Sequence, residues 1–237
     1  MKVVSYSQVD TLEYGYDPHS FVYSILLEVQ AANAQTEAYE ILKSLTDLSW
    51  VNKFDVIDRQ SYLACAEPTI NKIVESILKK VGNTVEKEFG EYLVSYSAQR
   101  ALVDTLAHRP LPLAELIKEK VSGNPGFDFH TVSPQEFIVF GEAKYASSGS
   151  AYDEAQPQIV DFLKAENNKH LKELKELRRF AGDTPAQNVI ENKFGVAAAF
   201  SIRAQKPKLI LNNAIKRPEF KDLLVNKEVY VIGVHIV

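Results

Sequence analysis

Three charged side chains near the middle of the chain have the types and spacing of a metal-dependent hydrolytic site. Asp128 lies in the segment FDFH, and Glu142 and Lys144 lie in GEAKY, directly after the apolar run FIVF. Residues two apart on a β-strand project from the same face, so the Glu142 carboxylate and the Lys144 ammonium group would point together. Carboxylates on adjacent strands can hold Mg²⁺, and a lysine beside them can orient an attacking water or neutralise charge on a phosphate. The pattern predicts a metal site formed by Asp128 and Glu142.

The Glu-x-Lys triplet alone is not informative, because it occurs four times in the chain. The other three copies are Glu173/Lys175, Glu191/Lys193 and Glu219/Lys221. The first of these falls in a charged helical stretch, where residues two apart do not share a face, and the other two flank helical or loop segments. Only Glu142 and Lys144 follow a continuous apolar run. The competing interpretation is a structural ion pair of Lys144 with Glu142 or Asp128, because charges in a buried sheet need partners.

The elements that must position these side chains can also be predicted. Two strand-like runs separated by Ser133 and Pro134 predict a β-hairpin from Phe127 to about Tyr145, which would place Asp128 on the arm beside Glu142. Apolar runs predict further strands at 21–29, 195–202 and 228–237. Helical spacing of apolar residues predicts helices at about 38–45, 68–81, 84–107 and 113–121. A further helix is predicted from about 152, with a Lys/Glu-rich second half that ends at a break at 182–185. A short helix is predicted near Phe220, after a Lys/Pro-containing loop.

This order of elements predicts an α/β (α+β) fold with a central mixed sheet flanked by helices. We expect two parts, an N-terminal α+β extension over residues 1–82 packed on a core over residues 83–237. The chain has a net charge of −4, 46% hydrophobic residues and one cysteine, Cys65, which excludes an internal disulfide and a cysteine-rich zinc site. No apolar run approaches the ~20 residues of a membrane span. These features predict a soluble, cytoplasmic protein that does not coat nucleic acid through a basic excess.

The segments GFDFH, FIVFGEAKY and QPQIVDF resemble the motifs of the PD-(D/E)xK nuclease superfamily over about residues 88–162. The resemblance implies a restriction-endonuclease-like core with Asp128 as the first acid, Glu142 and Lys144 as the Glu-x-Lys pair, and Gln158 as the helical glutamine. Gln156 is a near competitor of Gln158. Members often add an acid from a preceding helix, for which Glu91 is the first choice and Glu88 the second. The proline in the family's name is missing here, since Phe127 precedes Asp128.

The same resemblance implies an activity and partners. It implies a Mg²⁺-dependent endonuclease, in which Mn²⁺ would substitute for Mg²⁺, acting on DNA. The length, the α+β leader and the pairing of GFDFH with GEAKY are more narrowly similar to the HamA nuclease subunits of Hachiman antiphage defence systems, which would imply a HamB-like helicase subunit as partner. The alternative is a nuclease-like fold without catalysis that regulates or tethers such a helicase.

Two further features have simpler interpretations. His130 could share a face with Asp128, but a histidine hydrogen-bonded to a neighbouring side chain explains it as well. A run of basic residues could follow a phosphate backbone, but the interleaved acids Glu166, Glu173 and Glu176 favour an ordinary solvated helix face. These basic residues are Lys164, Lys169, Lys172, Lys175, Arg178 and Arg179.

Overall fold

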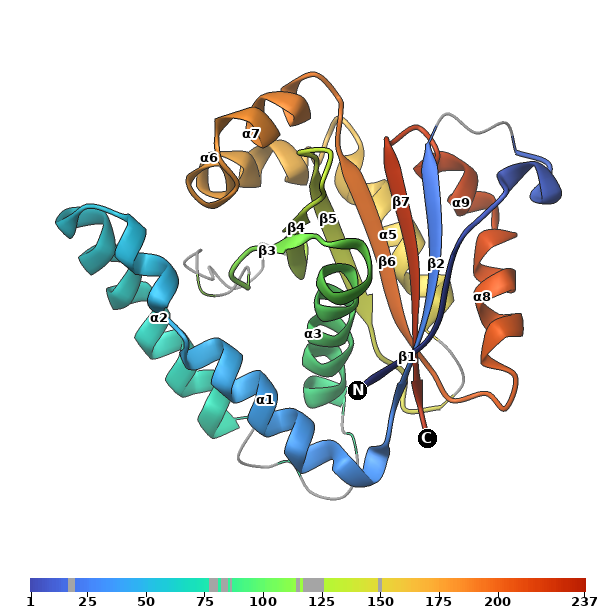
Figure 1. Cartoon of the computed structure of the whole chain (residues 1–237), viewed down its shortest axis with the longest axis horizontal. Coiled ribbons are helices and arrows are strands. Elements are labelled where there is room, and N and C mark those ends of the chain that lie inside the picture. Colours follow the sequence, from blue (N-terminus) through green and yellow to red (C-terminus); the bar gives the residue numbers. More distant parts are fainter. Residues whose placement is uncertain are drawn as a thin grey trace.

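The chain forms one seven-stranded sheet with helices on both faces (Figure 1). A computed structural model describes residues 1–16, 20–76, 81, 85, 87–113, 116, 126–148 and 151–237, apart from the side chains of residues 76, 87 and 88. The strand order is β1-β2-β7-β6-β5-β4-β3. The strands are β1 Lys2–Gln8, β2 Phe21–Val29, β3 Arg109–Pro110, β4 Phe129–Val132, β5 Ile138–Lys144, β6 Gly195–Ile202 and β7 Glu228–Ile236.

The centre of the sheet is parallel and its two edges are antiparallel. Strands β2, β7, β6 and β5 run in parallel, while β1 and the β4–β3 pair run antiparallel to their neighbours. Central parallel strands have both faces covered, so they are apolar along their length rather than alternating. Strand β6, with the sequence GVAAAFSI, is buried at every residue, as this rule requires.

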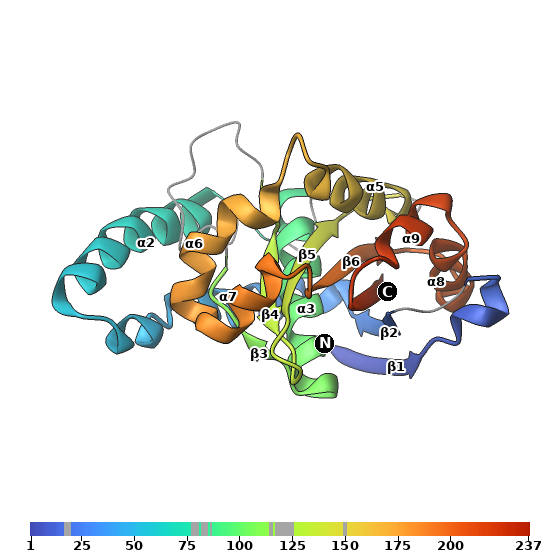
Figure 2. The ribbon, with the colours of Figure 1, turned by 90° about the horizontal axis from the view of Figure 1, so that it is seen from above.

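Helices divide between the two faces of the sheet. They are α1 Ala34–Thr46, α2 Val56–Ser76, α3 Lys87–Leu106, α5 Tyr152–Leu163, α6 Lys169–Ala181, α7 Asp183–Ile190, α8 Pro207–Ile215 and α9 Pro218–Leu223, with short 3-10 helices at Thr11–Tyr14, Ala31–Asn33 and Ser49–Lys53. One hydrophobic cluster joins one sheet face to α1, α2 and α3, and a second joins the other face to α5 through α9. Helices α1 and α2 project to one side, away from α8 and α9 (Figures 1 and 2).

Several predicted elements are confirmed. The strands predicted at 21–29, 195–202 and 228–237 correspond to β2, β6 and β7, and the hairpin from Phe127 to Tyr145 corresponds to β4 and β5. The helix predicted at 84–107 corresponds to α3, the one at 38–45 to α1, and the one near Phe220 to α9. The helix predicted at 113–121 lies almost entirely outside the described residues.

Three helix boundaries were predicted wrongly. Helix α2 begins at Val56, where Asp55 accepts hydrogen bonds from the amides of Ile57 and Asp58, and it continues through Pro68 instead of starting there. The helix predicted from residue 152 is interrupted at residues 164–168, where Asn168 has a left-handed backbone with φ of 46°, so α5 and α6 are separate. Helix α7 begins at Asp183, inside the predicted break, because only Gly182 leaves helical geometry.

Strand β1 and helix α8 are among the elements that the sequence did not predict. Five of the seven residues of β1, KVVSYSQ, are exposed because the strand lies at the sheet edge. Helix α8, PKLILNNAI, replaces the predicted Lys/Pro-containing loop, and Pro207 stands in its first turn, where a missing amide hydrogen costs nothing. Proline in the first turn of a helix is a helix-start signal, so the segment predicted as a loop is a helix.

The N-terminal residues belong to the same sheet as the rest of the chain. Strand β2 pairs with β7 over its whole length, from Phe21 opposite Glu228 to Val29 opposite Ile236, and β1 pairs with β2. The predicted boundary between an N-terminal extension at 1–82 and a core at 83–237 falls at residues outside the described part. No helix among the described residues is long and apolar enough to cross a membrane.

Candidate active site

The β4–β5 hairpin places Asp128 opposite Glu142. Phe129 pairs with Gly141 and His130 pairs with Phe140, and the amide of Asp128 donates to the carbonyl of Gly141 at 2.9 Å, which extends the ladder by one residue. The ring of Phe129 lies where a side chain at position 141 would be, at 2.3 Å from an ideal Cβ, so only glycine fits there. This register of the β4–β5 pair brings the carboxyl groups of Asp128 and Glu142 to neighbouring positions on the sheet.

Asp128, Glu142 and Lys144 are held together by short hydrogen bonds. The amide of Ala143 donates to Oδ2 of Asp128 at 2.8 Å, and Nζ of Lys144 donates to Oε1 of Glu142 at 2.7 Å. Glu142 is only 1% exposed, and the Lys144 side chain is 19% exposed. On β5, residues 140, 142 and 144 share the face that packs against α5. The lysine therefore lies between a buried carboxylate and the surface.

The charges of this group are not balanced. Burial, together with the negative charge of Asp128, raises the pKa of Glu142 to about 9, although Lys144 acts to lower it. Burial acts to lower the pKa of Lys144, but the carboxylates of Glu142, Asp128 and Glu91 outweigh it, so the pKa of Lys144 is raised. The lysine thus stays protonated, and the two facing carboxyl groups retain a proton near neutral pH because one ammonium group does not neutralise both.

The residues fit a hard divalent cation. Oε2 of Glu142 is buried and has no hydrogen-bond donor among the described residues, and the Asp128 carboxyl group lies beside it. Two carboxylates with one unsatisfied oxygen are the ligands that Mg²⁺ and Mn²⁺ prefer, and a bound cation would remove the charge repulsion that raises the pKa of Glu142. Within the described part of the chain, no set of three or more His, Cys, Asp or Glu side chains converges on a common point.

Helix α3 brings a third acid into the same electrostatic surroundings. Glu91 lies in the first turns of α3, is half-buried, and contributes to the raised pKa of Lys144. The helix can approach closely because Gly90 lies against the ring of Tyr145, where a Cβ would meet ring atoms at 2.3 Å. The side chain of Glu88, the second choice for this acid, lies outside the described residues.

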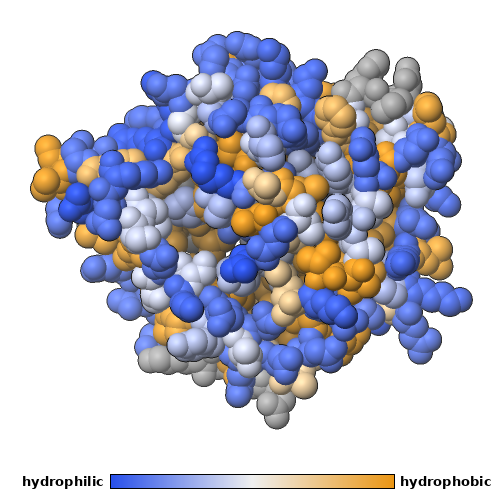
Figure 3. Space-filling model, in the orientation of Figure 1, coloured by the Kyte–Doolittle hydropathy of each residue, from blue (hydrophilic) through white to orange (hydrophobic). Residues whose placement is uncertain are grey.

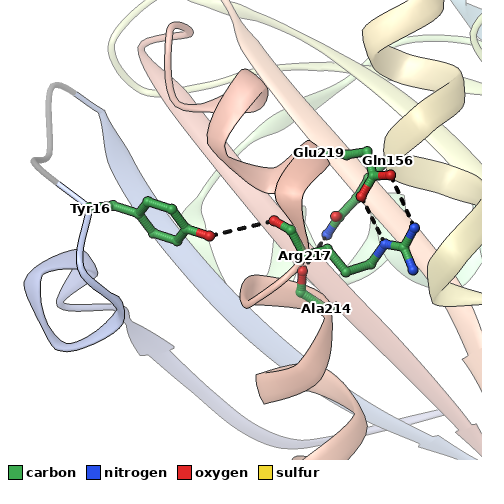
Figure 4. Close-up of polar contacts among 5 residues, drawn as sticks. All are labelled: Tyr16, Gln156, Ala214, Arg217 and Glu219. Carbon is green, nitrogen blue, oxygen red and sulfur yellow. Dashed lines mark hydrogen bonds and ion pairs between the residues drawn. The ribbon is translucent and has the colours of Figure 1, made fainter.

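The two candidate glutamines on α5 have different surroundings. Gln156 is fully buried and its Nε2 donates to the carbonyl of Ala214 at 3.0 Å, at the end of α8 (Figure 4). The ion pair of Arg217 with Glu219 lies next to it in the same view. Gln158 is half-buried and makes no side-chain hydrogen bond within the described part of the chain. Gln156 therefore ties α5 to α8, while the Gln158 amide remains available to a ligand.

A buried contact of His130 with Glu173, next to Asp128, anchors the helix that covers this corner. Oε2 of Glu173 on α6 lies 2.8 Å from Nε2 of His130, and Oε1 of Glu173 accepts from the amide of Phe127 at 3.2 Å. The interpretation of His130 as a histidine hydrogen-bonded to a neighbour is confirmed. The inward position of Glu173 was not predicted, because its helix appeared charged on most sides; its spacing from Leu174, Leu177 and Phe180 was the available signal.

Chemically, the arrangement can bind a cation between two carboxylates and present a protonated lysine beside it. Such a site polarises a bound water or an oxyanion and stabilises negative charge that develops during hydrolysis. Comparisons with known protein families, with curated proteins and with solved structures give no significant match.

Proposed function

We propose that this chain is a metal-dependent nuclease that hydrolyses phosphodiester bonds in DNA, with Asp128 and Glu142 as ligands of Mg²⁺. The observation that carries the proposal is the buried pair of facing carboxyl groups, Asp128 and Glu142, with a single lysine bonded to Glu142. A purely structural ion pair needs one acid and one base. Asp128 adds a second acid beside Glu142, and burying two acids next to one ammonium group costs more than burying a single pair.

Each residue then has a role that matches its position. A bound Mg²⁺ would supply Lewis acidity and offset charge on the phosphate. Lys144, protonated and partly exposed, would donate a hydrogen bond to the attacking water or to a phosphate oxygen. Glu91 would bind a water of the cation at the edge of the site, and Gln158 would bind the substrate backbone from α5.

The wider setting is proposed from the sequence resemblance. A mixed sheet with a site hairpin, preceded by α3 and followed by α5, is consistent with the restriction-endonuclease-like core of PD-(D/E)xK nucleases. The narrower resemblance to HamA subunits supports a role as the effector of a helicase-coupled antiphage system in the cytoplasm. The net charge of −4 supports weak DNA binding by the isolated chain and delivery of the strand by the helicase subunit.

The test compares two Glu-x-Lys pairs of the same chain. Glu142→Ala and Lys144→Ala are measured beside Glu191→Ala, since Glu191 and Lys193 form an exposed ion pair of 2.8 Å with the same spacing. Nicking of plasmid DNA with Mg²⁺ or Mn²⁺, with and without the helicase subunit, and the thermal midpoint are recorded for each variant. We expect the first two variants to lose nicking while keeping the midpoint of the parent or exceeding it, because loss of Glu142 relieves carboxylate crowding.

The outcomes separate catalysis from a structural ion pair. If Lys144 and Glu142 only stabilise the fold, removing either leaves a buried charge and lowers stability by about 3–5 kcal/mol. A collapsed midpoint for Glu142→Ala, or nicking that persists in it, therefore contradicts the proposed site. A parent that never nicks DNA while it binds the helicase favours the alternative, a non-catalytic regulatory subunit. Glu191→Ala should match the parent in both measurements, because exposed ion pairs contribute little.

A further inference from the structure

Helix α6 has one apolar face and one strongly basic face. The side chains that face the core are buried, and those on the opposite arc are exposed. The buried set is His170, Glu173, Leu174, Leu177 and Phe180. The exposed set is Leu171, Lys172, Lys175, Arg178 and Arg179. At 100° per residue the exposed set spans about one third of the helix circumference, so its four cations form a single stripe.

Glu173 points away from this stripe, and Glu176 lies at its edge against α2. Glu173 is 6% exposed and is bonded to His130 and to the amide of Phe127. Glu176 is half-buried and accepts a hydrogen bond of 3.0 Å from Tyr62 on α2. The alternation of Lys and Glu in the sequence therefore does not produce an alternation of charge on the surface, and the outer face of α6 is basic.

Part of this positive charge has no acidic partner. Arg178 pairs with Asp183 at 2.6 Å and Arg179 pairs with Asp58 at 2.8 Å. Lys172 and Lys175 make no ion pair with any residue that the structure describes. Cations without acidic partners on an exposed helix face are free to neutralise an anion of another molecule, at no cost of breaking an existing pair.

More cations gather at the C-terminal end of α6. Arg109 donates to the carbonyls of Phe180 at 2.9 Å and Ala181 at 2.7 Å, so its guanidinium group caps the helix. Nζ of Lys53 lies 4.9 Å from the centre of the Phe180 ring. Burial and the nearby charge of Arg109 lower the pKa of Lys53. Two like charges are thus held near each other where the stripe ends.

The basic stripe lies on the outer face of a helix that packs beside the candidate active site. Glu173 of α6 contacts Phe127, which precedes Asp128, and the end of α6 contacts Arg109, which pairs with Val132 at the far end of β4. Helix α6 has 13 residues and is therefore about 20 Å long. Figures 1 and 2 both show α6 next to β4 and β5, and hydrophilic residues cover this part of the surface in Figure 3.

We propose that the stripe Lys172, Lys175, Arg178 and Arg179 binds the phosphodiester backbone of the DNA strand that is presented to Asp128 and Glu142. The inference rests on the proposed function, because it assigns the path of that function's substrate. Regularly spaced cations without deep pockets suit a polyanion that is bound through its backbone rather than its bases. An acidic protein surface is the other polyanion that such a stripe would bind, and the experiment below distinguishes the two.

The test removes two cations and compares a control with the same change in charge. The double variant Lys172→Gln/Lys175→Gln is compared with Lys208→Gln/Lys221→Gln, whose lysines are exposed on α8 and α9 at the other side of the molecule. Binding of a fluorescein-labelled single-stranded DNA is followed by anisotropy in EDTA at several salt concentrations. Each lost phosphate contact lowers the slope of log K against log salt by about 0.7, so we expect a slope smaller by about 1.4 and affinity roughly 10-fold weaker at low salt.

The control variant should bind as the parent does. If Lys172→Gln/Lys175→Gln and the parent have equal DNA affinity and an equal slope of log K against log salt, the proposed path is overturned. An acidic protein surface would then be the ligand of the stripe. No measurable binding of DNA by the parent would overturn it as well. If the parent nicks DNA and the lysine variant binds DNA as the parent does, only the proposed path along α6 is rejected. If DNA binding depends on the two lysines but the parent never nicks DNA, the proposed nuclease activity is rejected and the DNA-binding stripe is retained.

Discussion

Two buried glutamates of the same sheet, Glu142 on β5 and Glu228 on β7, have opposite surroundings. Both are at most 2% exposed, and burial raises the pKa of each. Oε2 of Glu228 accepts from the hydroxyl of Tyr230 at 3.0 Å, and a hydrogen bond with Ser133 acts against the rise of its pKa. Glu142 instead faces Asp128, a second acid, whose charge raises the pKa of Glu142 further.

The network around Glu228 extends further and satisfies every member. Nε2 of His108 lies 3.1 Å from the hydroxyl of Tyr230, and Nδ1 of His108 lies 2.9 Å from Oγ1 of Thr131. Since Tyr230 gives its proton to Glu228, a neutral His108 with its proton on Nε2 completes the chain, and Thr131 donates to Nδ1. A satisfied buried network of this kind stabilises one packing arrangement. The difference shows that burial of a glutamate does not by itself indicate a functional site. A buried glutamate that faces a second acid, as Glu142 faces Asp128, does indicate one.

The largest expected effect comes from substituting Glu142 and Glu228 in separate variants. Glu142→Gln should lower the nicking rate about 100-fold or more, since a lost metal ligand removes several kcal/mol of transition-state stabilisation, and should leave the free energy of unfolding unchanged or higher. Glu228→Ala should keep the nicking rate and lower the free energy of unfolding by about 1–3 kcal/mol, because Tyr230 loses its acceptor. Urea unfolding and plasmid nicking measure both. Stability loss in the first variant, or lost nicking in the second, breaks the comparison.

A second expectation concerns pH and the neutral state of His108. Burial lowers the pKa of His108 from 6.5 to about 4, so the folded state disfavours the protonated ring. The unfolded chain then binds more protons between these values, and His108 lowers the free energy of unfolding as pH falls, by about 3 kcal/mol in total. The raised pKa of Glu228 acts in the opposite direction, since a protonated Glu228 favours the folded state.

The variant His108→Gln isolates the histidine contribution. It keeps a polar group near Tyr230 and Thr131 but cannot titrate, so its free energy of unfolding should fall less than that of the parent between pH 6.5 and 4. Urea unfolding at several pH values within this window gives the difference between parent and variant, in which Glu228 and other groups largely cancel. Parallel curves would show that His108 does not remain neutral in the folded protein.

The smallest expected effect separates the two glutamines of α5. Gln156→Ala should lower the free energy of unfolding by about 1 kcal/mol, because the buried hydrogen bond that joins α5 to α8 is lost while the Ala214 carbonyl keeps the amide of Arg217 as a donor, with no change in nicking. Gln158→Ala should keep the stability of the parent and slow nicking, because it removes an amide available to the substrate. The reverse result would make Gln156 the glutamine of the site and would change the assignment of the α5 face.

Helix ends were predicted less well than strands, for physical reasons that particular residues show. The apolar runs of β6 and β7 are short, and β7 is rich in β-branched residues, which favours buried strands over buried helices, so their positions could be predicted. Pro68 predicts a helix start, but α2 starts at Val56, where Asp55 accepts the hydrogen bonds of the first helical amides. Residues 56–67 contain only two buried side chains, Tyr62 and Ala66, so their periodicity was too weak to indicate a helix.

The sequence by itself determined the hairpin, the shared face of Glu142 and Lys144, and the position of Asp128 on the neighbouring arm. These follow from the period of two along a strand and from turn residues, which are local properties. Only the tertiary structure decided which acids are buried, that Glu173 points inward, and that it is Gln156 that donates a hydrogen bond to α8. Desolvation and pairing depend on segments that are distant in the chain, so the raised pKa of Glu142 and the basic outer face of α6 appear only when the helices pack on the sheet.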